Sequence, residues 1–230
     1  MKQTLLAGLP AISVTLSDAQ VQTLCAFGTA LLEKNQVMNL TAIRDEAGVA
    51  RLHFLDSLAL LGAADFRNKT VIDVGCGAGF PGVPLKIGEP SVKLTLLDSL
   101  GKRMAWLAEL LPQLGVDAEV VNARAEDYCK EHRESFELCT SRAVARLNVL
   151  AELCLPLVKV GGLFLAMKGS QAEDELREAS HAIKTLGGAL EQVCPYPCGD
   201  ATHYVVCIRK LHPTPAAYPR TFAKIKQKPL

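Results

Sequence analysis

The residues best suited to chemistry in this chain lie in the sequence TVIDVGCGAGFPG, residues 70–82. A short β-type run ends at Asp73, and it is followed by the glycines Gly75, Gly77, Gly79 and Gly82. Glycine accepts positive φ angles and lets a ligand lie against bare backbone, which a Cβ would prevent. This pattern is typical of a strand that turns sharply into a helix around a nucleoside-containing cofactor.

A second acidic residue stands where such a cofactor needs one. Asp98 ends the apolar run LTLLD, roughly 20 residues beyond the glycines. A ribose-binding carboxylate belongs at this distance in a nucleoside-binding α/β unit. We therefore expect Asp98 to bind the ribose hydroxyls.

Two cofactor classes fit the glycine loop. Residues 77–82 match the G-x-G-x-x-G pattern of dinucleotide-binding proteins, such as an NAD-dependent oxidoreductase. Residues 75–79 match the G-x-G-x-G loop of S-adenosylmethionine-dependent methyltransferases. Asp73 favours the methyl donor, because a pyrophosphate avoids a nearby anion, whereas S-adenosylmethionine carries a cationic ammonium group and a cationic sulfur.

Motifs that the sequence lacks reduce the number of possible methyl acceptors. Exocyclic amino groups of bases are usually methylated beside an Asn/Asp-Pro-Pro-aromatic loop, but here the corresponding strand ends in Thr140-Ser141-Arg142-Ala143. Methylation at pyrimidine C5 needs a thiolate after a proline, and no proline precedes Cys139. Guanine N7 needs neither device, because its lone pair is already nucleophilic and carries no proton. The sequence therefore favours guanine N7, and a small-molecule methyltransferase is the alternative.

Composition limits the general class of protein. The 230 residues are 49% hydrophobic, which is enough for a substantial core in one domain. A net charge of +1 gives no global attraction to nucleic acid, so any basic surface must be local. No apolar run approaches the ~18 residues of a membrane helix, and the N-terminus is a poor secretory signal. We expect a cytoplasmic protein with no membrane association and no obligate protein partner.

The spacing Cys194-x3-Cys198-x4-His203-x3-Cys207 loosely resembles a zinc site. The alternative is that Cys207 and His203 lie on one strand, with the two other cysteines on the preceding strand and its turn. We expect no metal.

The elements that must position these residues follow from periodicity and capping. Residues 1–66 predict a helical cap, with one helix capped by Ser17 and Gln20 and another capped by Asp45. Residues 67–211 predict an α/β domain of the class I methyltransferase type, Rossmann-like and mostly parallel, with an antiparallel hairpin at one edge. Residues 212–230 predict a basic, irregular tail. Strands are expected at 70–74, 92–98, 118–122, 136–141, 162–168, 189–194 and 202–209, and helices at about 55–63, 81–88, 100–114, 146–157 and 171–186.

Several motifs occur together from about residue 17 to residue 210. They are NLTAI (39–43), HFLDS (53–57), DVGCGAGFPG (73–82), LDSLGKR (97–103), RAE (124–126), SRA (141–143) and MKG (167–169). With these motifs the sequence resembles the bacterial small-subunit ribosomal RNA guanine-N7 methyltransferases, also called glucose-inhibited division protein B. The resemblance implies S-adenosylmethionine as cofactor and 16S ribosomal RNA, or the small ribosomal subunit, as partner.

The resemblance also implies roles for residues around the cofactor. Gly75 and Phe80 would line it, and Gly77 and Gly79 would supply bare backbone. Ala125 and Glu126 would flank the adenine.

Arg142 would sit beside the methyl-donor end and face the substrate, where its guanidinium can hydrogen-bond guanine O6. We predict Arg142 as the catalytic residue and as a cofactor contact. The alternative is a structural bridge from Arg142 to Asp73 or Glu126.

Substrate contacts are expected from two sources. His53 and Asp56 share a face of the cap and could meet the base or form only a structural hydrogen bond. Asn39 could contact a base or simply end a helix. A large anionic substrate also requires a basic rim. Its candidates are Arg44, Arg51, Lys102, Arg103, Arg124, Lys168, Arg209, Lys210 and the basic tail.

A non-catalytic RNA-binding protein that retained the pocket is the alternative from a different functional class.

Overall fold

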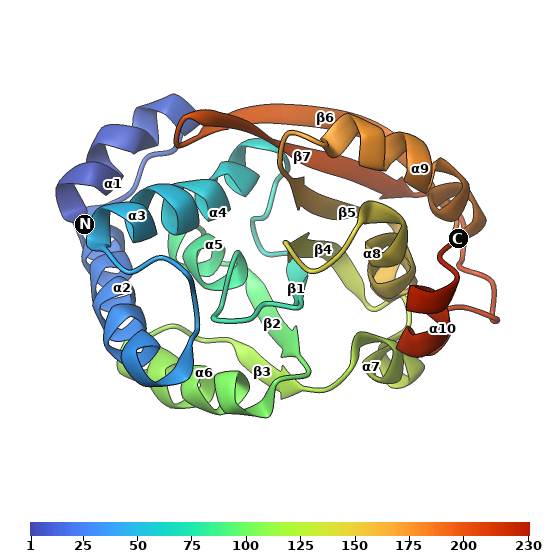
Figure 1. Ribbon diagram of the computed structural model, residues 1–230, viewed down its shortest axis with the longest axis horizontal. Coiled ribbons are helices and arrows are strands. Elements are labelled where there is room, and N and C mark those ends of the chain that lie inside the picture. Colours follow the sequence, from blue (N-terminus) through green and yellow to red (C-terminus); the bar gives the residue numbers. More distant parts are fainter.

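The computed structural model describes residues 1–230 as a twisted sheet with helices on both faces (Figure 1). The 7-stranded sheet has the order β3-β2-β1-β4-β5-β7-β6, and only β7 runs antiparallel to its neighbours, β5 and β6. The strands are β1 (Thr70–Val74), β2 (Lys93–Asp98), β3 (Glu119–Asn122), β4 (Phe136–Arg142), β5 (Val158–Lys168), β6 (Gly188–Cys198) and β7 (Ala201–Lys210). The predicted fold class and antiparallel edge hairpin are confirmed, although β5 and β6 are longer than expected.

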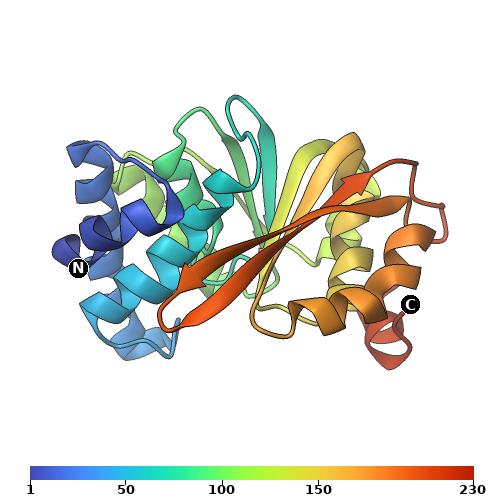
Figure 2. The ribbon, with the colours of Figure 1, turned by 90° about the horizontal axis from the view of Figure 1, so that it is seen from above.

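The sheet separates two apolar clusters, because successive side chains of a strand point to opposite faces. In β5, Leu163 and Leu165 join the cluster beneath the N-terminal helices, whereas Phe164 and Ala166 join the other one. Figure 2 shows the corresponding two groups of helices on either side of the sheet. The helices that follow the strands are α5 (Gly82–Gly88), α6 (Gly101–Gln113), α7 (Ala125–His132), α8 (Leu147–Cys154) and α9 (Ala172–Thr185).

Helix α7 was not predicted from the sequence. Cys129 is its one buried residue, so the segment has no apolar stripe that periodicity could detect. Its position is fixed instead by the end of β3 and by packing against α8.

The N-terminal cap consists of one long helix and several short ones, and they share one core with the sheet. Ser17 and Gln20 form the predicted capping box of the longest helix, and the amide of Gln20 also donates to the carbonyls of Ile87 and Gly88 at the end of α5. Asp45 caps the next helix as predicted, accepting from the N–H of Gly48. The elements of the cap are α1 (Lys2–Gly8), η1 (Leu9–Ile12), α2 (Asp18–Met38), α3 (Glu46–Val49), η2 (Ala50–Leu55), α4 (Asp56–Leu58) and η3 (Ala59–Gly62).

The C-terminal tail is not wholly irregular, contrary to the prediction. It contains helix α10 (Phe222–Gln227), whose Ile225 is buried in the cluster beside α8. Arg220 donates to Glu152 of α8 through its backbone N–H, its Nε and its Nη2. Composition predicted irregularity because proline and lysine dominate the segment, whereas the anchoring partners lie far away in the sequence. None of the helices is long and apolar enough to span a membrane.

We predict that Arg220→Ala lowers the free energy of unfolding by about 3 kcal/mol, because it leaves the fully buried Glu152 carboxylate without its cation. Urea denaturation followed by circular dichroism measures the effect. Lys224→Ala, which removes an exposed cation of the same tail, is the control and should change stability by less than about 0.5 kcal/mol. Equal stabilities of the two variants would contradict an anchoring role for Arg220.

Candidate functional site

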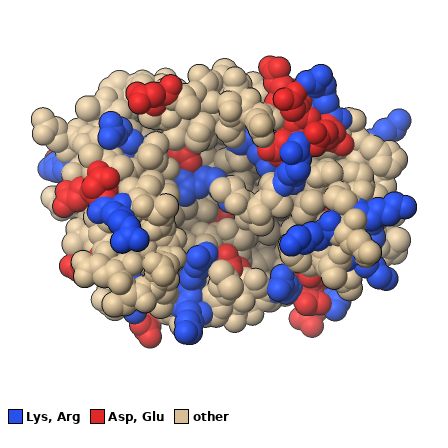
Figure 3. Space-filling model, viewed as in Figure 1, with Lys and Arg blue, Asp and Glu red and all other residues tan.

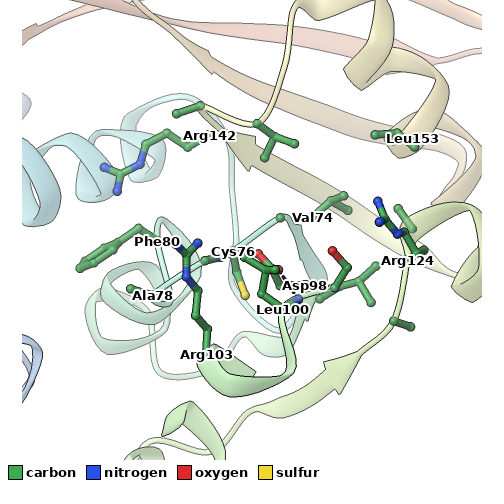
Figure 4. A pocket seen from close by; sticks show the side chains of 18 of the residues that line it. Val74, Cys76, Ala78, Phe80, Asp98, Leu100, Arg103, Arg124, Arg142 and Leu153 are labelled. Atoms are coloured by element: carbon green, nitrogen blue, oxygen red, sulfur yellow. Dashed lines mark hydrogen bonds between the residues drawn. The ribbon is translucent and has the colours of Figure 1, made fainter. Parts of the chain in front are cut away.

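The main cavity opens at the carboxyl ends of β1, β2 and β4 and has a volume of about 440 Å³ (Figure 4). The chain runs outward from β1 to β3 and then returns to β4, so the neighbouring β1 and β4 mark the point where the strand order reverses. Ligands of open α/β sheets bind in the crevice at such a point. The glycine loop after β1 forms the floor of this cavity.

The loop can take its shape only with glycine at critical positions. Gly75 has a φ of +73°, and a Cβ there would lie 2.4 Å from Val144 Cγ2. Gly79 has a φ of +95°, and a Cβ there would lie 2.7 Å from Val83 Cγ2. Larger residues would therefore be strained at both positions and would push the loop away from its neighbours.

Asp73 lies behind the loop and not on the cavity wall. It is fully buried, and its Oδ2 accepts from the N–H of Gly82 at 2.7 Å, which holds the start of α5 against β1. Burial raises the pKa of Asp73 to about 7. Its Oδ1 has no hydrogen-bond partner, so the carboxylate retains an acceptor for a polar group under the loop. The expected direct approach of Asp73 to a cationic ligand group is replaced by bracing of the loop from beneath.

Asp98 lies on the cavity wall at the end of β2, as predicted. Its Oδ2 accepts from the N–H of Gly77 at 2.9 Å, and its Oδ1 accepts from the N–H of Leu100 at 2.8 Å. Each carboxylate oxygen has two lone pairs, so both remain able to accept from a ligand hydroxyl. Asp98 thus hydrogen-bonds both the glycine loop and the backbone at Leu100, and it still offers acceptors to a ribose.

The far end of the cavity is formed around the start of α7. Ala125 and Glu126 line it, as predicted, together with Arg124. Phe222 of the tail also lines it, and its backbone N–H donates to Glu126 Oε1 at 3.1 Å. Sequence reasoning missed Phe222, because nothing near it in the sequence resembles a binding motif.

At the opposite end, Arg142 is held in a fixed orientation. Its Nη1 donates to Asp56 Oδ2 at 2.6 Å and to the carbonyl of Leu52 at 3.3 Å, and its Nη2 lies 3.2 Å from His53 Nδ1. Its guanidinium also lies over the ring of Phe80, 5.1 Å from the centroid. The structural alternative named Asp73 or Glu126 as the partner of Arg142, and that was wrong: the partner is Asp56.

Both ring nitrogens of His53 contact polar neighbours. Nδ1 lies 3.1 Å from the carbonyl oxygen of Leu52 and 3.2 Å from Arg142 Nη2, and Nε2 lies 2.7 Å from Thr41 Oγ1. Burial, together with the charge of Arg142, lowers the pKa of His53 to about 4. The imidazole is therefore neutral at physiological pH, and it stacks on Phe80 with the ring centroids 4.5 Å apart.

Asp56 connects the cap to the edge hairpin. Its Oδ1 accepts from Tyr196 Oη and from His203 Nδ1, each at 2.9 Å, while Oδ2 binds Arg142. Burial alone would raise the pKa of Asp56, but the bonds from His203, Arg142 and Tyr196 outweigh it and lower the pKa to about 2. The carboxylate is thus charged and accepts three hydrogen bonds, and it positions Arg142. Tyr196 and His203 were not predicted as site residues.

A second cavity, of about 550 Å³, adjoins the first. The two share His53, Arg142, Ala143 and Val144 in their linings, so Arg142 lies at their junction. Tyr196, His203 and Lys168 form much of the remaining polar wall of the second cavity. A ligand in the second cavity would meet one in the first beside the Arg142 guanidinium.

The other predicted substrate residues have mixed outcomes. Lys168 is buried and donates to the carbonyl of Ala145, with Glu175 as its ion-pair partner, so it braces the loop after β4 instead of facing solvent. Asn39 ends α2 with a φ of +51° and does not line the main cavity, which matches the helix-end alternative. Leu40 and Thr41, directly after it, do line the cavity.

Not all of the basic residues predicted to surround the cavity are available to a ligand. Lys210 is completely buried beside Glu134, and Arg209 pairs with Glu191. Arg103 and Arg124 do line the main cavity. Figure 4 shows Arg103 rising from α6 toward the loop that carries Phe80, while Arg142 arrives from the end of β4.

The proposed zinc ligands are not gathered into one set. Cys198 and His203 lie near Asp56, and these three residues form the one group spaced closely enough to hold an ion. Cys194 and Cys207 lie further along the β6–β7 hairpin, opposite Val205 and Gln192. This arrangement matches the strand alternative, in which the spacing reflects a hairpin.

We predict that His53 itself reduces stability by about 3 kcal/mol as the pH falls from about 6.5 to about 4, because the unfolded chain then binds a proton on His53 that the folded chain does not. Asp73, with its raised pKa, acts in the opposite direction over this range, so the contribution of His53 is measured as a difference between proteins. Urea unfolding of the wild type and of His53→Gln across this window measures it, and the stability of the variant relative to the wild type should rise as the pH falls. His181→Gln, at an exposed histidine, is the control, and equal slopes for all three proteins would contradict a neutral, buried His53.

Comparison with known proteins identifies related sequences. The sequence profile of the rRNA small subunit methyltransferase G family matches residues 20–197. The chain is 45% identical over 236 residues to the ribosomal RNA small subunit methyltransferase G of Alkaliphilus oremlandii, covering 100% of this chain and 99% of that protein. It is 44% identical over 223 residues to the protein of the same name from Lactobacillus acidophilus, covering 94% of this chain and 93% of that protein.

Solved structures support the fold. TrmN from Thermus thermophilus superposes with a TM-score of 0.56 at 20% identity, over 68% of this chain and 48% of that one. A SAM-dependent methyltransferase from Aquifex aeolicus superposes with a TM-score of 0.54 at 17% identity, over 71% of this chain and 94% of that one. With the sequence matched over nearly its whole length and the glycine loop, Asp98 and Arg142 gathered around one cavity, the chain belongs to the rRNA small subunit methyltransferase G family.

Proposed function

We propose that this protein transfers the methyl group of S-adenosylmethionine to N7 of a guanine in 16S ribosomal RNA. The observation that carries the proposal is the position of Arg142, at the junction of the two cavities and held there by Asp56. A cytoplasmic location follows from such a substrate.

The residues of the main cavity fit the cofactor. When bound, S-adenosylmethionine supplies an electrophilic methyl group on a positively charged sulfur. Asp98 has acceptor capacity left on both oxygens for the ribose hydroxyls, and Ala125 and Glu126 are placed to flank the adenine. The glycine loop offers bare backbone between these two groups, and the free Oδ1 of Asp73 lies behind it as an unused acceptor.

Arg142 is suited to hold the acceptor base. Its Nη1 hydrogens are used by Asp56 and Leu52, and one Nη2 hydrogen is used by His53. The Nε–H and the second Nη2 hydrogen remain, and they lie on the same edge of the guanidinium. That edge can donate to guanine O6 and leave the N7 lone pair free to attack.

No residue at this junction is arranged as a general base. Both ring nitrogens of His53 are engaged by neighbours, Nδ1 by Leu52 and Arg142 and Nε2 by Thr41, so neither is free to accept a proton from a substrate. Asp56 is a weak base, because its pKa is lowered to about 2 and its oxygens already accept three hydrogen bonds. Guanine N7 loses no proton during methylation, and it therefore matches a site that aligns and stabilises charge but does not abstract a proton.

Local positive charge supports an RNA substrate. Figure 3 shows a hollow in the middle of the face seen in Figure 1, with Lys and Arg side chains inside it and around its edge. Arg103, Arg124 and Arg142 line the cavity against the two acids Asp98 and Glu126, although the net charge of the chain is only +1. Phosphate groups would contact the outer cations while one base enters the cavity.

A methyl-transfer assay with labelled S-adenosylmethionine tests the proposal. Unmethylated small-subunit RNA, intact small subunits and total small metabolites serve as separate acceptors, and the modified nucleosides are then identified. We expect the label in 7-methylguanosine, with a yield that falls as salt rises. Label in a metabolite would overturn the RNA substrate, and transfer to no acceptor would favour an RNA-binding protein that retained the pocket.

We predict that Arg142→Ala lowers kcat by about 100-fold or more, because a positioned donor at a reacting centre contributes about that much. Arg142→Lys, which can still pair with Asp56 but lacks the planar fork, should lose most of the activity with little change in stability. Steady-state kinetics and thermal unfolding of both variants provide the measurement. Turnover close to that of the wild type in either variant would remove Arg142 from catalysis.

We predict that Asp98→Ala raises the Kd for S-adenosylhomocysteine about 10-fold or more, since it removes charged acceptors from the ribose and also frees the loop at Gly77. Isothermal titration calorimetry measures the change. Asp65→Ala, at an exposed carboxylate that does not line the cavity, is the matched control. An unchanged affinity for Asp98→Ala would mean that the ribose lies elsewhere.

A further inference from the structure

We propose that the C-terminal tail supplies the outer wall of the adenine end of the methyl-donor cavity, with Phe222 as the residue that contacts the purine. This inference rests on the proposed function, because it takes the end of the cavity at Ala125 and Glu126 as the adenine end. It adds a binding residue that lies outside the α/β core and beyond the matched residues 20–197.

The tail is fixed to the domain before it reaches the cavity. Arg133 donates to the backbone carbonyls of Thr214, Pro215 and Tyr218, at 2.7, 3.0 and 2.7 Å. Arg220 then forms its ion pair with the buried Glu152. Two arginine anchors therefore determine where the residues after Arg220 lie.

Directly after the second anchor, Phe222 meets the start of α7 in two ways. Its backbone N–H donates to Glu126 Oε1, and the guanidinium of Arg124 lies over its ring, 5.4 Å from the centroid. The tail thus orients the side chain of Glu126, which lines the cavity, and it packs the ring of Phe222 against the guanidinium of Arg124. These contacts tie Phe222 to residues that the cofactor itself would touch.

The surroundings of the ring suit a flat, apolar ligand group. Phe222 is only partly buried, and it lines the main cavity together with Leu153, Ala123 and Ala125. These side chains offer apolar surface but no hydrogen-bonding group, so they would recognise the face and the shape of a purine. The ring cannot be replaced by a neighbour, because Ala223 and Lys224 are exposed and do not line the cavity.

The test compares Phe222→Ala with Lys226→Ala, an exposed residue of the same helix, by isothermal titration calorimetry. The probes are S-adenosylhomocysteine and 5′-methylthioadenosine, which carries the adenosine but not the amino acid. We expect Phe222→Ala to raise the Kd of both probes by the same factor, about 10-fold, because stacking on an aromatic ring contributes affinity of this order. Lys226→Ala should leave both affinities unchanged.

Phe222→Leu separates binding from folding, because leucine preserves apolar packing but removes the aromatic face. We expect its melting temperature to match that of the wild type, with a several-fold weaker affinity for both probes. Wild-type affinity in Phe222→Ala or Phe222→Leu would overturn the inference and leave the proposed function standing. A wild-type protein that binds neither probe would instead refute the proposed cofactor.

Discussion

The site depends on the buried ion pair between Asp56 and Arg142. Asp56 comes from the N-terminal cap, Arg142 from the end of β4, and the other partners of Asp56, Tyr196 and His203, from the edge hairpin. Removing two charges from water is costly, and the cost is offset only when the hydrogen bonds of both groups are satisfied. Here the carboxylate and its hydrogen-bond donors come from three parts of the chain that are distant in sequence, so the pair can form only in the completed fold.

The same pair determines what Arg142 can still do. With one edge of the guanidinium held by Asp56, Leu52 and His53, the other edge is left for a ligand in a fixed direction. A donor that is already oriented loses little freedom when it binds, which is how a protein assists a reaction that requires no proton transfer. His53 supports this arrangement through its contact with Arg142 and by stacking on Phe80.

Much of the fold follows from the sequence because its signals are local. Alternating apolar runs and glycine turns located every strand, and Ser17 with Gln20 located the start of the longest helix. The segments that escaped prediction lack such signals. Helix α7 buries only Cys129, and the tail is held by Arg133 and Glu152, which the sequence does not connect to it.

For the site, the sequence by itself determined the glycine loop and Asp98, because their geometry depends on one strand and the turn that follows it, whereas Ala125 and Glu126 were expected only from the family resemblance. Only the tertiary structure decided which partner holds Arg142, that Lys168 faces inward, and that Phe222 reaches the cavity. Each of these outcomes depends on contacts between residues far apart in the chain. The type and spacing of residues indicate which groups a chain can offer, but burial and competing partners decide which of them remain free to bind.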